Sequence, residues 1–250
     1  MQHNQTQLFS SFQYNQVTPE IIENLIELTK KFKGDLTVTL SIPTSTTTAV
    51  PELPLGLGAQ ADRNEQETRI KKSRELMVRM KQQCEESRIS FTGMMSKRKK
   101  QVQTSTDIDM VILPKRFETI RLSSFFVGHN SLNYMRKRHV PVWLIPSQHL
   151  KLDSFYFFSL SPGITTVQNE FIEESKRRFN LPSPTCVKNK DSIIDILVAE
   201  SESSCSVLEK PSLLLFSESC FYGIPLINKL YMKFLSFLKN SSHHIVMIPE

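Results

Sequence analysis

The spacing of apolar residues changes along the chain and separates expected helices from expected strands. Residues 36–42 alternate between apolar and polar side chains and are rich in β-formers, which predicts a strand. Before them, apolar residues recur at helical spacing from Ile21 to Phe32, after a Thr-Pro pair that suits a helix start. Gly34 is expected to end this helix. With residues 8–12 as a first strand, the chain opens as strand, helix, strand.

Two fully apolar runs farther along indicate buried strands of a parallel sheet. Residues 110–113 end at a proline, and residues 140–145 include one proline and precede another. A helix is expected between the runs, with Asn130 as its N-cap and basic residues near its C-terminal end. A polar helix at residues 62–86 and a strand at residues 89–94 complete a five-stranded, doubly wound unit.

The C-terminal part of the chain repeats this pattern. An apolar run at residues 212–216, a helical spacing at residues 225–239 and a closing strand at residues 245–248 follow in the same order. In both copies the ends of the two strands are 32 residues apart, and both closing strands end in Ile-Pro. An internal repeat of this kind indicates two copies of one structural unit.

The second copy is shorter than the first. Its expected elements are a strand at residues 155–158, a helix from Thr165 or Thr166 to Phe179, a strand at residues 185–187 and a helix from Ser192. One helix–strand pair is therefore missing. We predict an α/β fold of two tandem doubly wound, mostly parallel-sheet domains of the Rossmann-like type. The domains are residues 1–147 and a shortened copy at residues 148–250.

Composition places the chain among ordinary globular proteins, with 39% hydrophobic residues. No run approaches the ~18 apolar residues of a membrane helix, and the N-terminus has no signal-peptide pattern. The four cysteines are widely spaced without a CxxC pair, which favours reduced thiols. We expect a cytoplasmic protein that makes no membrane contact.

Positive charge is concentrated in the first part of the chain. Residues 1–150 carry 21 Lys and Arg against 14 Asp and Glu, and the remaining residues carry 10 against 11. No aromatic platform or DNA-reading motif accompanies the basic groups, so solvated helix faces and loops are the favoured interpretation. Binding of an anion or nucleic acid through the basic first half remains an alternative.

Three stretches together resemble the universal stress protein family in its tandem two-domain form. Residues 25–43 resemble the family's first helix and second strand, and residues 126–146 resemble its last loop, helix and strand. Residues 211–249 echo the last loop, helix and strand in the second copy. Members of this family commonly pair through the last strand. The resemblance therefore implies that residues 142–145 and 245–248 lie side by side.

Nucleotide-binding members of the family carry an acidic residue after the first strand and three spaced glycines, the last followed by Ser or Thr. Glycines let backbone N–H groups approach phosphate, and the helix that follows favours negative charge. When Gly128 is matched to the last glycine, Lys115 and Glu118 stand at the earlier two. His129 replaces the hydroxyl, and Gln13 stands near the acidic position. The resemblance thus implies a degenerate ATP site.

The remaining candidates for a first-copy site are vestigial: Gly128, Asn130, Ser131 and Lys115. The second copy has no glycine at any matched position, since these hold Glu218, Phe221 and Tyr231. We expect no cofactor, with ATP as the only one to consider. No metal is expected either, because adjacent His243 and His244 point to opposite faces of a strand.

No nucleophile–base motif stands out, so we predict a protein that is not an enzyme. The favoured function is regulatory or scaffolding, through a protein partner or self-association through the terminal strands, and nucleic acid is not the expected partner. One alternative is an ATP-binding stress sensor or weak ATPase that uses a non-standard loop. Another is the anion or nucleic-acid binder described above.

Overall fold

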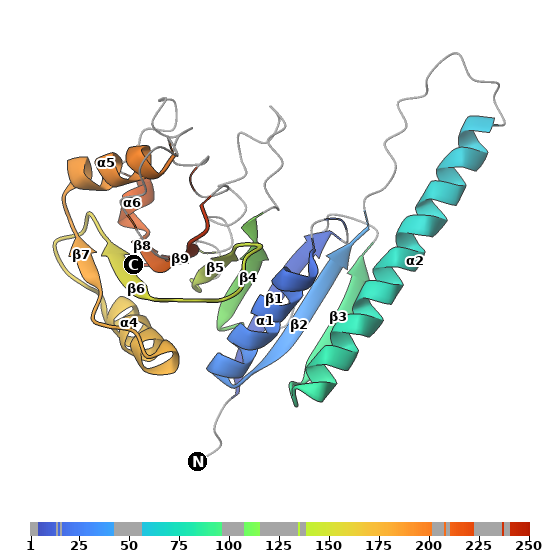
Figure 1. The fold of residues 1–250 in the computed structure, drawn as a ribbon, viewed down its shortest axis with the longest axis horizontal. Helices are drawn as coiled ribbons and strands as arrows, with labels where there is room; N and C mark the ends of the chain where they lie inside the picture. The colour runs from blue at the N-terminus through green and yellow to red at the C-terminus, as the bar shows by residue number, and fades with distance from the viewer. Residues whose placement is uncertain are drawn as a thin grey trace.

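The computed structural model shows one nine-stranded sheet with helices on both faces (Figure 1). The residues that it describes are 5–13, 15, 17–42, 57–96, 108–115, 135, 139–201, 208, 211–222, 237 and 241–250. All neighbouring strands are parallel except one pair. The predicted α/β class with a mostly parallel sheet is confirmed.

The first half of the chain contributes five strands and two described helices. In chain order they are β1 (Thr6–Gln13), α1 (Pro19–Phe32), β2 (Gly34–Ser41), α2 (Leu57–Glu86), β3 (Phe91–Ser96), β4 (Met110–Pro114) and β5 (Val142–Ile145). The second half contributes β6 (Ser154–Phe158), α4 (Thr166–Phe179), β7 (Thr185–Val187), α5 (Lys190–Ser201), β8 (Ser212–Ser217), α6 (Ser219–Tyr222) and β9 (His244–Ile248).

The strand order repeats the same arrangement twice. The full order is β3-β2-β1-β4-β5-β9-β8-β6-β7. Read outward from the centre, each half presents its last strand, then the strand before it, then its first and second strands. Among the described strands, only those of the first half continue to a third strand of this series, β3, so the predicted shortening of the second copy is visible in the sheet. The division at residue 147 remains a prediction.

The two halves join through the antiparallel pair β5–β9, as the resemblance implied. Trp143 lies opposite Val246, and Val142 and Leu144 lie opposite Met247 and Ile245. Val246 is 103 positions after Trp143, the same offset that relates β4 to β8 and the two Ile-Pro endings. Trp143 therefore pairs with its own repeat equivalent, and the offset exchanges the other two pairs with each other. A pseudo-twofold axis passes through the Trp143–Val246 pair.

The same axis relates α1 and α4. Both helices have 14 residues and both end in a phenylalanine, Phe32 and Phe179, which are 147 positions apart. In each case the next residue, Lys33 or Asn180, adopts the left-handed conformation that ends the helix. Equivalent residues of the two halves are 147 positions apart in these helices but only 103 positions apart in the last strands. The missing 44 positions correspond to α2 and β3 with their connections.

The second copy lacks counterparts of α2 and β3 among its described elements, and the surface of α4 differs from that of α1 accordingly. In α1 a stripe formed by Ile22, Ile26 and Thr29 is buried, and α2 lies beside α1. The equivalent positions of α4 are polar, and none is fully buried: Asn169, Glu173 and Lys176. The shortened copy thus presents a hydrophilic face where its counterpart has a neighbouring helix.

Successive side chains of each strand point to opposite faces of the sheet, so the core consists of two clusters, one on each face. Trp143 and Ile145 of β5 pack with α1, α2 and α4, whereas Val142 and Leu144 pack on the other face with residues of α5. Met135 and Phe237 are buried in this second cluster. They are the only described residues of the helices expected at residues 130–138 and 225–239, which otherwise lie outside the described ranges.

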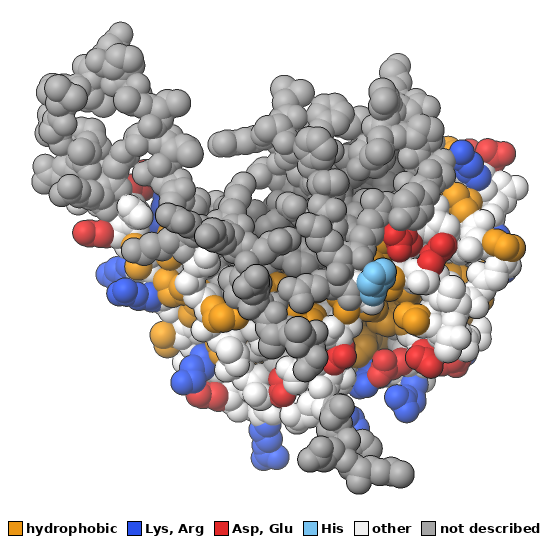
Figure 2. Space-filling model, turned by 180° about the vertical axis from the view of Figure 1, so that it is seen from behind, with side chains coloured by type: hydrophobic (Ala, Val, Ile, Leu, Met, Phe, Trp, Pro, Cys, Tyr) orange, Lys and Arg blue, Asp and Glu red, His pale blue; other side chains and the backbone are white. Residues whose placement is uncertain are grey.

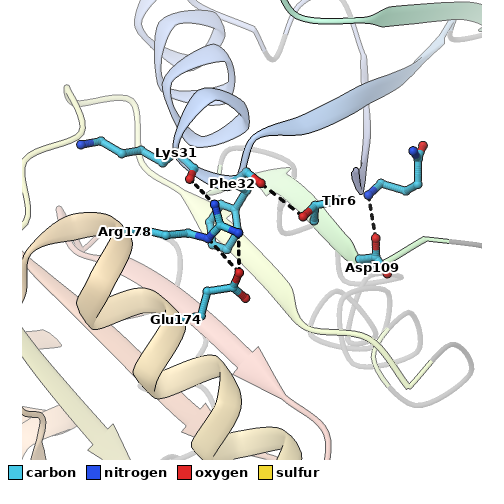
Figure 3. A network of polar contacts seen from close by, with 7 residues as sticks. Thr6, Lys31, Phe32, Asp109, Glu174 and Arg178 are labelled. Carbon is cyan, nitrogen blue, oxygen red and sulfur yellow. Dashed lines mark hydrogen bonds and ion pairs between the residues drawn. The ribbon is translucent and has the colours of Figure 1, made fainter. Parts of the chain in front are cut away.

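Contacts at the ends of α1 and α4 hold the two halves together on one face (Figure 3). Arg178 of α4 donates to the carbonyl oxygen of Lys31, pairs with Glu174 and lies 4.9 Å from the ring centroid of Phe32. In the same view Thr6 donates to the carbonyl oxygen of Phe32 at 3.2 Å. The last turn of α1 is therefore bonded both to α4 and to β1.

Several element boundaries differ from the sequence expectation. The helix α2 begins at Leu57 rather than residue 62, because the Ala- and Gln-containing stretch after it favours helix. The strand β3 begins at Phe91, two residues later than expected, and α5 begins at Lys190, two residues earlier than Ser192. The expectation that Gly34 ends α1 is wrong: Lys33 takes the left-handed conformation, and Gly34 already belongs to β2.

Candidate functional site

Doubly wound sheets bind ligands at the carboxyl ends of strands, where the chain reverses its direction of winding. This sheet has two such switch points, between β1 and β4 and between β6 and β8. At the first, Ser10 donates to the carbonyl oxygen of Ile112 at 2.7 Å, which joins β1 to β4. Lys115 follows β4 directly and is the one vestigial candidate that the structure describes.

The Lys115 side chain is buried and reaches into the second half of the chain. Its Nζ donates to the hydroxyl of Ser241 at 2.7 Å, to the carbonyl oxygen of Ser241 at 3.0 Å and to the carbonyl oxygen of His243. An ammonium has three N–H donors, and these three acceptors match that number. The amine of Lys115, at a position that the family resemblance matches to a glycine, therefore holds the turn that precedes β9.

His243 is buried beside this amine and is held at both ring nitrogens. Its Nδ1 accepts the backbone N–H of Ser212 at 3.0 Å, and its Nε2 lies 3.4 Å from a carboxylate oxygen of Glu200. The Glu200 side chain is 7% exposed and also accepts the backbone N–H of Leu208. Burial lowers the pKa of His243, and Lys115 lowers it further, against an opposing effect of Glu200.

His244 lies on the other side of β9, against Trp143. The Trp143 indole donates to Nδ1 of His244 at 3.1 Å, and the two rings meet edge to face. Nε2 of His244 is buried and has no hydrogen-bond partner in the described part of the chain. Burial holds the pKa of His244 well below its usual range, and the positive charge of Lys115 adds to this effect.

Gly128, Asn130 and Ser131 lie outside the described residues, as do Glu118 and His129. Their roles as site residues therefore stay predictions. At the same switch point, the N-cap Thr18 makes no side-chain capping bond to α1, and its buried hydroxyl has no partner in the described ranges. Its counterpart in the second half, Thr165, caps α4 fully.

At the second switch point, polar groups of the protein form hydrogen bonds with one another. Thr165 and Gln168 form a reciprocal capping box at the start of α4. The buried amide of Gln168 also donates to Ser217 at 3.2 Å, and the Ser217 hydroxyl lies 3.1 Å from a carboxylate oxygen of Glu250. Ser219 accepts the backbone N–H of Leu160 and lies 3.0 Å from Ser217.

Glu218 occupies the second-half position that corresponds to Lys115, 103 residues later. It is 9% exposed, and its backbone N–H donates to the carbonyl oxygen of Ile248 at 3.0 Å. A carboxylate therefore stands at the carboxyl end of β8 where the first half has an amine. The repulsion between a carboxylate and a phosphate group makes this a poor position for a nucleotide.

The sequence reasoning missed Glu200 and Gln168. The pattern Thr165-x-x-Gln168 is visible as a capping-box signature before a helix, so Gln168 could have been found. Glu200 could not have been found, because its partner His243 is 43 positions away on another element. Among the described residues, no group of three or more His, Cys, Asp and Glu side chains is arranged to hold a metal ion.

Within the described ranges, no helix combines the length and the apolar character that crossing a bilayer requires.

No protein-family model matches this chain, and the comparison with curated proteins gives no match. Solved structures do match. A universal stress protein from Archaeoglobus fulgidus DSM 4304 has a TM-score of 0.53 at 10% identity, with 98% of this chain and 97% of that chain covered. A functionally unknown protein from Pseudomonas aeruginosa PAO1 has a TM-score of 0.49 at 7% identity, with 97% and 92% covered. The predicted resemblance is confirmed at the level of the fold, across both halves of the chain.

Proposed function

We propose that this chain, with its universal stress protein fold, acts as a regulatory or scaffolding protein through protein–protein contacts and does not use a bound nucleotide. The observation that carries the proposal is the placement of the Lys115 amine. At the first switch point it is bonded to Ser241 and His243 rather than left for a ligand. A phosphate would have to compete with three existing acceptors for this cation.

The second switch point supports the same function. Ser217, Ser219 and Gln168 bond to one another there, and Glu250 and Glu218 add two carboxylates near the strand ends. A nucleotide needs backbone N–H groups and positive charge around its phosphates. In the described part of the second half, the switch point thus presents carboxylates where phosphates would need positive charge.

Calorimetric titration with magnesium–ATP tests the proposal directly. We expect no heat of binding, no nucleotide released from the denatured purified protein, and no change in melting temperature at millimolar ATP. A ligand at 100 times its dissociation constant would add about 2.7 kcal/mol of stability. Copurified nucleotide, or a dissociation constant in the micromolar range, would overturn the proposal.

One observation favours the alternative of a nucleotide-binding sensor. The buried Thr18 hydroxyl at the start of α1 lacks a described partner, and α1 begins at the first switch point. A ligand there would supply an acceptor or donor for this hydroxyl. Under this alternative, Thr18→Val lowers ATP affinity while the equivalent change at Thr165 does not, since Thr165 caps its own helix.

The scaffolding function requires a contact surface. The inner strands β5 and β9 pair with each other, so the outer strands of the described sheet are β3 and β7. Large exposed apolar side chains lie on α2 and β3, at Val78 and Met95, and near the start of α4, at Ile164 and Val167. Light scattering of the purified chain, alone and with the changes Val78→Ser and Val167→Ser, tests whether self-association uses either region.

The described surface supports protein contacts over nucleic-acid binding. On the face shown in Figure 2, described Lys and Arg side chains lie among Asp and Glu side chains rather than in a continuous basic area. Nucleic-acid affinity relies on clustered positive charge and falls steeply with salt. We expect at most weak, salt-sensitive binding in fluorescence anisotropy, and tight binding of a defined sequence would contradict this.

A further inference from the structure

The strand β9 is the element through which the second half of the sheet is joined to the first. It pairs with β5 over three residue pairs, whereas β1 and β2 pair over eight. The turn before β9 is fixed by Lys115 through Ser241 and His243. Because the junction is short, a change in this turn acts directly on the contact between the halves.

Both histidines at the start of β9 accept a hydrogen bond on Nδ1. His243 accepts the backbone N–H of Ser212, and His244 accepts the indole N–H of Trp143. A protonated imidazole has two N–H donors and no acceptor. Protonation would therefore place a donor against a donor at each site, and both sites are buried. The lost bonds lie on β8 and on β5, the two neighbours of β9.

The charged groups around the two rings do little to stabilise the protonated imidazoles. His243 faces Glu200 from α5, which favours protonation, and Lys115 from the end of β4, which opposes it. In the described part of the chain, the charged groups acting on His244 are Lys115 and His243, and neither is acidic. Charging His244 would thus bury a second cation next to an existing one, at a high desolvation cost.

We propose that the start of β9 is an acid-sensitive latch: protonation of His243 and His244 breaks their bonds to Ser212 on β8 and to Trp143 on β5, and releases the start of β9 from both neighbouring strands. At neutral pH both rings are uncharged and the halves are held together. Under acid conditions the start of β9 detaches and the β5–β9 contact opens, while the first half keeps its own parallel strands. This inference does not depend on whether the chain binds a nucleotide.

The direction of the pH dependence follows from the lowered pKa of both histidines. The unfolded chain takes up these protons near the ordinary pKa of about 6.5, before the folded chain does. The stabilising contribution is therefore complete above that pH and declines as the pH falls below it. Each unit by which a pKa is lowered corresponds to about a tenfold change in the opening equilibrium.

Hydrogen exchange of the full chain, resolved by peptide and corrected for the intrinsic exchange rate, tests the latch. Between about pH 7.5 and about pH 5, we expect the protection of β5 and β9 amides to fall at least about tenfold, while β1 and β2 change little. In the double variant His243→Gln, His244→Gln the loss should nearly vanish. Glutamine can accept the same two hydrogen bonds and does not titrate. The exposed His149 supplies the matched control His149→Gln, which should behave like the wild type.

Two single substitutions with opposite expected effects test the latch even if the double variant does not fold. Lys115→Met removes the opposing cation and keeps most of the length of the side chain, so the acid-induced loss of protection should become smaller. Glu200→Gln removes the group that favours protonation of His243, so the loss should become larger. Shifts of the same sign in both variants, or equal loss of protection across the whole sheet, would overturn the latch.

Discussion

Phe32 and Phe179 end equivalent helices and pack against each other, with ring centroids 5.9 Å apart at an interplanar angle of 61°. They are 147 positions apart in the chain and face each other across the pseudo-twofold axis. Trp143 lies within 5.8 Å of the first ring and 5.5 Å of the second, measured between centroids. The aromatic cluster therefore joins α1, α4 and β5 at the seam between the two halves.

Replacing Phe32 by alanine should destabilise the whole chain. The ring is 3% exposed and contacts aromatic side chains from both halves, so its loss leaves a cavity at the seam. We expect a loss of about 3–5 kcal/mol in the free energy of unfolding. Urea titration followed by Trp143 fluorescence measures it. The control Val78→Ala, at a side chain that is 67% exposed, should change stability by less than about 0.5 kcal/mol.

Arg178 and Arg177 are neighbours on α4 with different expected contributions to stability. Arg178 bonds to Glu174 and to the carbonyl oxygen of Lys31 and lies over Phe32, whereas Arg177 is exposed. We expect Arg178→Ala to cost about 1–2 kcal/mol and Arg177→Ala less than about 0.5 kcal/mol. Thermal denaturation of both variants measures the difference. Equal costs would mean that the contacts across the seam contribute nothing.

Glycine is needed at position 34 because the backbone of β1 approaches it closely, and not because it ends a helix. A Cβ at this position would clash with the backbone carbonyl oxygen of Thr6 on β1, which cannot move without breaking the pairing of β1 and β2. We expect Gly34→Ala to lower stability by about 1–3 kcal/mol. A Cβ at Gly163 would meet nothing within 4 Å, so Gly163→Ala should be neutral or slightly stabilising. Chemical denaturation of the two variants compares these costs.

Thiol reactivity should distinguish the described cysteines. Burial raises the pKa of Cys84 to about 11 and that of Cys220 to about 12, so almost no thiolate forms at neutral pH. Cys220 also donates to the carbonyl oxygen of Phe158. Cys186 is exposed on β7. Iodoacetamide labelling of the native chain, mapped by mass spectrometry, should modify Cys186 and leave Cys84 and Cys220 unmodified until the chain unfolds. Rapid labelling of Cys220 in the native state would contradict its placement.

The order of helices and strands could be predicted from the sequence because it depends on local periodicity. The alternation in β2, the helical spacing in α1 and the apolar runs of β4 and β5 each appear within a few residues. The repeat also predicted correctly that the second copy is shortened. Helix ends were less predictable: Lys33 rather than Gly34 took the left-handed conformation, since Gly34 was needed beside Thr6.

The candidate site was only partly predictable. The sequence singled out Lys115 as an unusual residue at a glycine position, and in the structure its amine donates to Ser241 and His243. Its partners Ser241 and His243 are 126 and 128 positions away, and no local pattern connects them. Gly128, Asn130 and Ser131 lie outside the described residues, so their role as vestigial site residues stays a prediction.

The sequence by itself determined the type and order of most elements, the internal repeat and the absence of glycine from every matched position of a phosphate loop except Gly128. Only the tertiary structure decided that Trp143 lies opposite Val246, that Phe32 meets Phe179, and that Lys115 and Glu200 converge on His243. Local propensity acts over a few residues, whereas these contacts depend on how two copies of one unit pack together. Their partners are therefore fixed by the geometry of the sheet and not by neighbouring residues in the chain.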